Sequence, residues 1–148
     1  MRLIIQRTSG VELFVDSKLH NSTGRGLLIF VGTKTGDNES LIPKLADKTV
    51  NIRIFEDKQG KMNLSPLDID GDLMVVSQFT LYADMNKGRR PSFNDAQEPK
   101  EAERLYNLFI DELKKSDLNI KSGIFGASMD IKFNNDGPVT IIIDNELS

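Results

Sequence analysis

The strongest constraint on the fold is a short apolar run, Gly26-Leu27-Leu28-Ile29-Phe30-Val31-Gly32. Its length and its flanking glycines are typical of a strand, and its apolar residues do not alternate with polar ones. A strand with a continuous apolar run is typically buried on both of its faces. We therefore expect residues 26–32 to form a strand inside the domain.

Two segments carry apolar residues at helical spacing. The first helix is predicted from about Asn38 or Glu39, and the second over Glu98 to Ser116. Acidic residues open the second segment and lysines close it, as the helix dipole favours. The expected buried positions are Leu41, Ile42, Leu45, Ala46 and Val50 in the first helix, and Ala102, Leu105, Leu108, Phe109 and Leu113 in the second.

The remaining apolar segments have the length and composition of strands. Asp16 to Arg25 is polar and is predicted as a hairpin loop, and Asp84 to Gln97 as a long loop. The pattern predicts one α+β domain over residues 1–148, with two main helices and a mostly antiparallel, barrel-like sheet. The predicted strands are Leu3 to Arg7, Val11 to Val15, Asn51 to Phe55, Asp72 to Leu81, Ile120 to Phe125, Met129 to Phe133 and Val139 to Asp144.

Composition excludes several kinds of chemistry. The chain has no cysteine, so thiolate catalysis and Cys-ligated metals are excluded, and its single histidine, His20, lies in a segment typical of a turn. No carboxylate cluster requires a metal, and we expect no cofactor. The chain has neither an apolar run of 18 residues nor a signal-peptide pattern at its start, which favours the cytoplasm and no membrane contact.

The dipeptide Gly137-Pro138 lies between two predicted strands. Proline cannot donate to a sheet ladder, and glycine lets another group approach the backbone closely. X-Pro bonds are also the ones that adopt the cis form readily. Taken alone, the dipeptide favours an ordinary turn between strands.

A polar patch, Ser77-Gln78-Phe79-Thr80, ends the predicted strand from Asp72. Alternation along a strand would place Ser77 and Phe79 on one face and Gln78 and Thr80 on the other. No histidine-based triad can be assembled around these hydroxyls, so a serine or threonine nucleophile lacks a visible base. Backbone N–H groups at the strand end could stabilise an oxyanion, which suits an already reactive ester. The alternative is that the hydroxyls bind nearby backbone and Phe79 packs in the core.

The chain resembles the bacterial D-aminoacyl-tRNA deacylases, also called the D-Tyr-tRNA deacylase family, over essentially its whole length. The two signature elements of that family are Ser-Gln-x-x-Leu at 77–81 and Gly-Pro-Val-Thr at 137–140. Further matching segments are Ile5-Gln6-Arg7, Ile52 to Phe55, Gly60 to Asn63, Gly88 to Phe93 and Gly123 to Ala127.

The resemblance implies an enzyme that hydrolyses the ester between a D-amino acid, or glycine, and the terminal ribose of mischarged tRNA. It implies a homodimer in which the cis Gly137-Pro138 loop of one subunit enters the active site of the other. Backbone carbonyls of that loop would face the substrate Cα and reject L-amino acids by collision. Glycine has no side chain and would pass.

The same resemblance implies roles for individual residues. Thr80 and the backbone of Phe79 and Thr80 would form the reaction centre, with Gln78 shaping the pocket and Ser77 supporting it. Phe125, with Met129 beside it, would bind the adenosine, and Arg7 would brace the Gly-Pro loop. Without the resemblance, Phe125 and Met129 are typical core residues and Arg7 a typical surface charge.

Three other functions stay open. One is an editing domain of similar fold that removes L-amino acids. Another is a non-catalytic nucleic-acid-binding protein that uses Lys87, Arg89 and Arg90, although a net charge of −3 argues against strong non-specific binding. The third is an esterase for small molecules.

Overall fold

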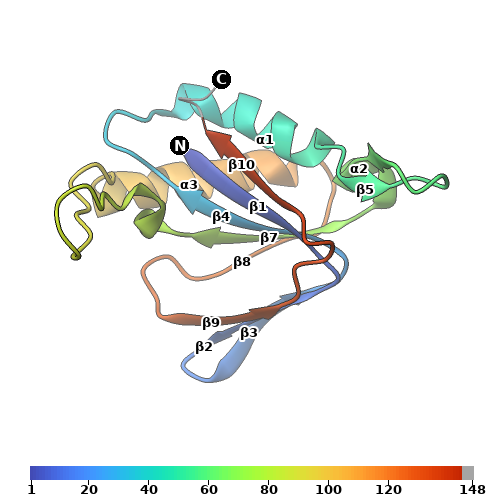
Figure 1. The fold of residues 1–148 in the computed structure, drawn as a ribbon, viewed down its shortest axis with the longest axis horizontal. Coiled ribbons are helices and arrows are strands. Elements are labelled where there is room, and N and C mark those ends of the chain that lie inside the picture. Colours follow the sequence, from blue (N-terminus) through green and yellow to red (C-terminus); the bar gives the residue numbers. More distant parts are fainter. Residues whose placement is uncertain (145–148) are drawn as a thin grey trace.

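The predicted apolar strand is β4 (Gly26–Gly32), and it lies in the middle of a five-stranded sheet. The computed structural model describes residues 1–144 (Figure 1). The sheet order is β10-β1-β4-β7-β8, with β1 (Arg2–Thr8), β7 (Asp72–Ser77), β8 (Ile120–Ser122) and β10 (Thr140–Asp144). β1 pairs antiparallel with β4 and β10, whereas β4 with β7 and β7 with β8 are parallel pairs.

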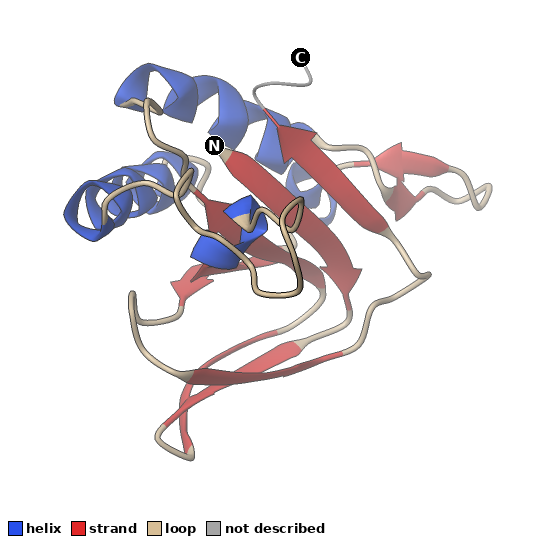
Figure 2. Cartoon of the chain, turned by 60° about the vertical axis from the view of Figure 1, so that its left-hand side comes forward, coloured by secondary structure: helices blue, strands red, loops and turns tan. Residues whose placement is uncertain are grey.

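A second sheet covers one face of the first. It has the order β3-β2-β9, with β2 (Val11–Val15), β3 (Lys18–Thr23) and β9 (Met129–Phe133), and all its pairs are antiparallel. Two helices, α1 (Ile42–Asn51) and α3 (Pro99–Lys114), lie on the opposite face of the five-stranded sheet (Figures 1 and 2). The result is a single α+β domain of three layers in which antiparallel pairs predominate.

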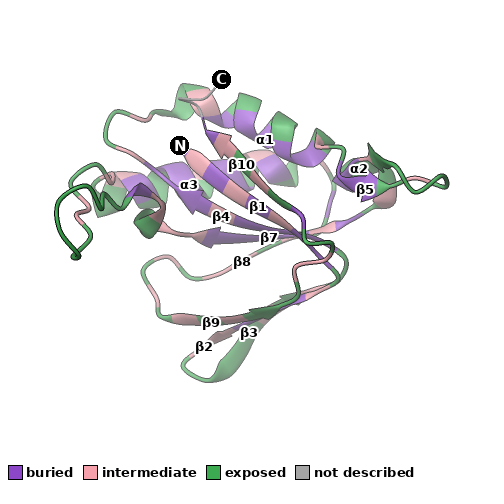
Figure 3. Ribbon diagram, in the orientation of Figure 1, coloured by how far each residue is buried: buried purple, intermediate pink, exposed green. Residues whose placement is uncertain are grey.

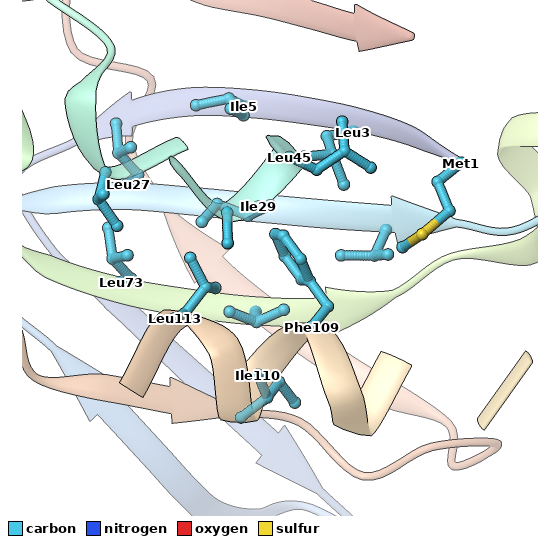
Figure 4. Packing of buried hydrophobic residues seen from close by; sticks show 14 of the residues in the cluster. Met1, Leu3, Ile5, Leu27, Ile29, Leu45, Leu73, Phe109, Ile110 and Leu113 are labelled. Carbon is cyan, nitrogen blue, oxygen red and sulfur yellow. The ribbon is translucent and has the colours of Figure 1, made fainter. Parts of the chain in front are cut away.

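The two faces of β4 belong to two apolar clusters. Leu27, Ile29 and Val31 pack toward the helices, in a large cluster that contains the fully buried ring of Phe109 from α3 (Figure 4). Leu28 belongs to a smaller cluster between the sheets, together with Met74 of β7. Burial of β4 on both faces, which the sequence predicts, is therefore confirmed (Figure 3).

Both main helices begin with a proline in their first turn, where its missing N–H group costs no helical hydrogen bond. A 3₁₀ turn at Glu39–Leu41 precedes α1, and the Asn38 side chain caps it by accepting from the N–H of Ser40. The predicted apolar face of α3 is correct except that Tyr106 and Ile110 are buried and Leu108 is only half-buried.

Short elements connect these layers. A two-stranded ribbon of β5 (Phe55–Glu56) and β6 (Met62–Leu64) follows α1, and the one-turn helix α2 (Pro66–Ile69) precedes β7. The short strand predicted over Asn51 to Phe55 was therefore misplaced, because Asn51 still belongs to α1. Within residues 1–144 no helix is both long enough and apolar enough to span a membrane.

The prediction of a hairpin loop over Asp16 to Arg25 was wrong. Residues 18–23 form β3, and only Asp16 and Ser17, which both have positive φ angles, make the turn. His20 lies in this strand and is exposed. β3 is an edge strand with no buried residue, so its sequence lacks the apolar alternation that would reveal it.

The start of β4 leaves no room for a side chain. A Cβ at Gly26 would lie 1.8 Å from the backbone oxygen of Asp72, its partner in the parallel pair. Gly26→Ala should therefore lower the free energy of unfolding by about 3 kcal/mol or more. Gly24→Ala is the matched control, because its Cβ would meet only the Asp72 carboxylate, at 3.4 Å, and should cost less than about 1 kcal/mol. Urea denaturation measures both, and equal midpoints would contradict this account of the β4–β7 contact.

Candidate active site

The polar patch begins where β7 ends. Ser77 is the last residue of β7, and the N–H of Gln78 still donates to the backbone oxygen of Val31 at 2.8 Å. Phe79–Tyr82 then form a 3₁₀ turn. The prediction of a strand through Leu81, with strict alternation from Ser77 to Thr80, was therefore wrong beyond Ser77.

A cavity of about 670 Å³ opens beside this strand end, between β7, the start of α3 and the connection from β8 to β9. Five of the residues predicted for the site line it, namely Ser77, Gln78, Phe79, Phe125 and Met129. The other lining residues are Val31, Thr33, Val76, Phe93, Ala96, Gln97, Glu98, Pro99, Ala102, Tyr106, Gly126, Ala127 and Ile131.

Aromatic rings form much of the cavity surface. Phe79 is 58% exposed, so it does not pack in the core, and its ring meets Phe93 edge-on with centroids 4.9 Å apart. Deeper in the cavity, Tyr106 and Phe125 lie at a tilt with centroids 6.0 Å apart. Phe125 is half-buried, and it both packs against the larger apolar cluster and lines the cavity. Such rings can stack on a flat ligand group.

The polar groups of the site lie at the strand end. The side-chain amide of Gln78 donates to the hydroxyl of Thr80, which is exposed and directly follows the lining residue Phe79. The backbone N–H groups of Phe79 and Thr80 have no acceptor among residues 1–144, since they open a 3₁₀ turn. Two adjacent free donors of this kind can stabilise negative charge on an oxygen atom.

Glu98 and Tyr106 are the ionisable side chains of the cavity lining. The Glu98 carboxylate accepts from the N–H of Glu101 at 3.3 Å and so caps α3. The Tyr106 hydroxyl donates to the backbone oxygen of Val75 at 2.8 Å, and burial raises its pKa well above the ordinary value. Tyr106 therefore stays neutral near pH 7. Among residues 1–144, no group of three or more His, Cys, Asp or Glu side chains is placed to hold a metal ion.

The Gly137-Pro138 loop is held by Arg7. The peptide bond of the dipeptide is cis, Gly137 has φ +133°, and both residues are exposed. Arg7 is 7% exposed, and its guanidinium donates to the backbone oxygens of Asp136 at 3.0 Å and Ile54 at 2.7 Å. Its own backbone accepts from the N–H of Asp136 at 2.8 Å and donates to Val139 at 3.1 Å. Arg7 is thus a buried contact of the loop and not a surface charge.

The loop lies at the edge strand β10, whereas the cavity lies beside β7, at the opposite end of the strands. Ser77 pairs with Val31 near the end of β4, whereas Thr140, just after the loop, pairs with Gln6 near the end of β1. The strands β1 and β4 separate β10 from β7 (Figure 1). Gly137, Pro138 and Arg7 therefore do not reach the cavity of their own chain.

Among the cavity residues that sequence reasoning did not assign are Phe93, Glu98 and Tyr106. Phe93 lies in residues 88–93, a segment that resembles the deacylase family, and Glu98 lies at the start of a predicted helix. Neither position predicted that the residue lies beside the end of β7. Tyr106 was hidden because its spacing on α3 fits a core position, which it also occupies. The packing of α3 beside β7 places Glu98 and Tyr106 at the cavity, and the contact with the Phe79 ring places Phe93 there.

Solved structures of the same architecture exist. One, described as "Structural Analysis of a probable eukaryotic D-amino acid tRNA deacylase", is 17% identical to this chain, with a TM-score of 0.83 over 96% of this chain and 97% of the other, and shows the shared fold. Another, described as "c-Myc DNA Unwinding Element Binding Protein", is 35% identical, with a TM-score of 0.91 over 98% of this chain and 99% of the other.

The sequence comparisons define the family. A family model described as "D-Tyr-tRNA(Tyr) deacylase" matches residues 4–144. A D-aminoacyl-tRNA deacylase of Aquifex aeolicus is 53% identical, and one of Thermoanaerobacter pseudethanolicus 49%, each covering at least 98% of both chains. The chain belongs to the D-aminoacyl-tRNA deacylases, a family of hydrolases.

Burial of Tyr106 predicts a pH dependence of stability. Because the folded state raises the pKa of this phenol, the unfolded chain ionises first as pH rises past about 10. The free energy of unfolding should therefore fall above pH 10, and it should fall less steeply in Tyr106→Phe. Urea denaturation of wild type and Tyr106→Phe between pH 8 and 11 (chosen to span the ordinary tyrosine pKa) measures this. An identical fall in wild type and Tyr106→Phe would contradict it.

Proposed function

We propose that this protein hydrolyses the ester bond between a D-amino acid, or glycine, and the terminal ribose of tRNA. It would thereby proofread mischarged tRNA in the cytoplasm. The observation that carries the proposal is the cavity itself, where Ser77, Gln78 and Phe79 adjoin Phe125 and Met129. Membership of the deacylase family supplies the reaction class.

The two parts of the cavity fit the two parts of such a substrate. The aromatic and apolar part, with Phe125 and Met129, suits the flat base of the terminal adenosine. The polar strand end would then lie at the ester, which joins the ribose to the amino acid. In this placement the aromatic part of the cavity binds the adenosine, and the polar strand end carries out the hydrolysis.

The chemistry would rest on positioning and not on a protein nucleophile. Water attacks the ester carbonyl carbon and the carbonyl oxygen becomes negatively charged. The C–O bond to the ribose then breaks, and the ribose oxygen takes up the proton that the attacking water has lost. The N–H groups of Phe79 and Thr80, which have no acceptor within residues 1–144, would stabilise that oxyanion. The neighbouring ribose hydroxyl of the substrate would assist the proton transfer, since the cavity lining offers no histidine, cysteine or lysine.

A second copy of the chain would complete the site. The Gly137-Pro138 loop is exposed and lies at the edge strand β10, which β1 and β4 separate from the cavity beside β7, so it can enter only the cavity of a partner. In the proposed homodimer, the carbonyls of this loop face the substrate Cα. A D side chain points away from them, an L side chain collides with them, and glycine passes. A backbone filter of this kind distinguishes D from L amino acids whatever their side chain.

The filter predicts a selectivity that depends on Gly137. Wild type should cleave D-aminoacyl-tRNA and glycyl-tRNA and leave L-aminoacyl-tRNA intact. A Cβ at Gly137 would lie 2.7 Å from the Val139 side chain and 3.1 Å from the Arg7 guanidinium, so Gly137→Ala must shift the loop. We expect the ratio of kcat/KM for D over L substrates to fall roughly tenfold or more. Parallel deacylation assays with both substrates measure it.

Gly60→Ala is the matched control. Gly60 also has a positive φ angle, +76°, but a Cβ there would meet nothing within 4 Å, and the residue sits in the turn before β6. This variant should keep the wild-type ratio. Faster cleavage of the L substrate by wild type would refute D-selectivity, and an unchanged ratio in Gly137→Ala would refute the filter.

The role of Thr80 gives a second test. If Thr80 positions groups and is not a nucleophile, Thr80→Ala should slow turnover by less than about tenfold, the worth of one hydrogen bond. A D-aminoacyl-tRNA that lacks the neighbouring ribose hydroxyl should react roughly 100-fold more slowly or worse. Single-turnover rates measure both. Complete loss in Thr80→Ala with unchanged binding, or a larger loss in Glu98→Gln, would contradict this mechanism.

Nucleic-acid binding without catalysis is the second candidate function. It is favoured by the likeness, at 35% identity, to a protein described as a DNA unwinding element binding protein. The deacylation assay separates the two functions, because a pure binding protein would bind uncharged tRNA or duplex DNA tightly and hydrolyse no D-aminoacyl ester.

A further inference from the structure

Residues 84–92 form a hairpin that projects from the domain. The backbones of Asp84 and Ser92 exchange two hydrogen bonds, of 2.8 and 2.9 Å, which close the base of the hairpin. Gly88 has φ +78° with open space around it and makes the turn. Residues 84–91 are all exposed, as the loop beside the start of α3 in Figure 3 shows.

The hairpin arises from the rim of the cavity. The 3₁₀ turn that contains Phe79 precedes it, and Phe93 follows it directly. The edge-on contact between these two rings holds the two arms together at the cavity mouth. A polymeric ligand that extends out of the cavity on this side would therefore lie along the hairpin.

The hairpin carries positive charge that the protein does not neutralise. Lys87, Arg89 and Arg90 have no ion-pair partner among residues 1–144, although the whole chain has a net charge of −3. Arg104 shows the contrast, because it pairs with both Glu39 and Glu101 at 2.7 Å. Asp84 is the one carboxylate of the hairpin, and it accepts from the N–H of Asn86 at 2.8 Å.

We propose that the hairpin of residues 84–92 binds the phosphates of the single-stranded RNA that continues from the nucleoside in the cavity. This inference rests on the proposed function and names the surface that receives the rest of the substrate. Guanidinium groups match phosphate oxygens in a two-pronged geometry, and an exposed pair of arginines with a lysine can follow successive phosphates. Glu98 at the cavity rim repels phosphates and so favours their placement toward the hairpin.

The experiment compares two substrates. One is a D-aminoacyl-tRNA, and the other is the D-aminoacyl ester of adenosine, which fills the cavity but has no phosphate. The test variant is Lys87→Ala/Arg89→Ala/Arg90→Ala. The control, Lys44→Ala/Lys48→Ala/Lys114→Ala, removes the same charge from exposed positions of α1 and the far end of α3.

The hairpin variant should have a KM for the tRNA substrate raised roughly tenfold or more, with kcat/KM for the adenosine ester kept. The slope of log(kcat/KM) against log salt should become shallower by about 2, since each lost single-strand phosphate contact contributes about 0.7. The control variant should keep the wild-type slope. An unchanged slope and KM in the hairpin variant would overturn the inference. Equal losses on both substrates would also overturn it, because the hairpin would then act only through the cavity.

Binding separates this inference from the proposed function. If wild type cleaved neither substrate, the proposed function would fall, but fluorescence anisotropy with uncharged tRNA would still test the hairpin. A shallower salt dependence of binding in the hairpin variant alone would support the hairpin as the phosphate contact. The same salt dependence in wild type and in both variants would refute it.

Discussion

The candidate site depends on the parallel pairing of β4 with β7. This pairing sets Ser77 beside Val31, and the next N–H group, from Gln78, still bonds to Val31 before the chain turns into the 3₁₀ segment. A slip of one residue would move every side chain of a strand to its other face. Because both faces of β4 lie in apolar clusters, such a slip would disrupt both at once. The position of the polar strand end is therefore fixed by the core and not by the polar residues themselves.

The sequence predicted those parts of the fold whose signal is local. The double burial of β4, the two main helices and most strands follow from apolar spacing that a short window contains. β3 was missed because an exposed edge strand has no apolar face. β7 was extended too far because Gln78 to Leu81 carry strand-type residues. The turn after Gln78 depends on β4, which lies far away in the sequence.

The site was predictable in part, and mainly from the family resemblance. The resemblance marked Ser77, Gln78 and Phe79 together with Phe125 and Met129, and the structure brings these five around one cavity. Tyr106 and Glu98 were not predicted, because their place beside β7 follows from how α3 packs against the sheet. The chemical roles of all these residues stay predictions.

Contacts with the Gly137-Pro138 loop explain how Arg7 can be buried. A charged guanidinium inside a protein is costly unless its donors are satisfied, and here backbone oxygens of Asp136 and Ile54 and the Asp136 carboxylate receive them. Val139 anchors the other end of the loop in the larger apolar cluster. The loop is thus shaped by its own chain before any partner binds. In the proposed dimer, each subunit would receive a preformed filter, so association would not have to order it.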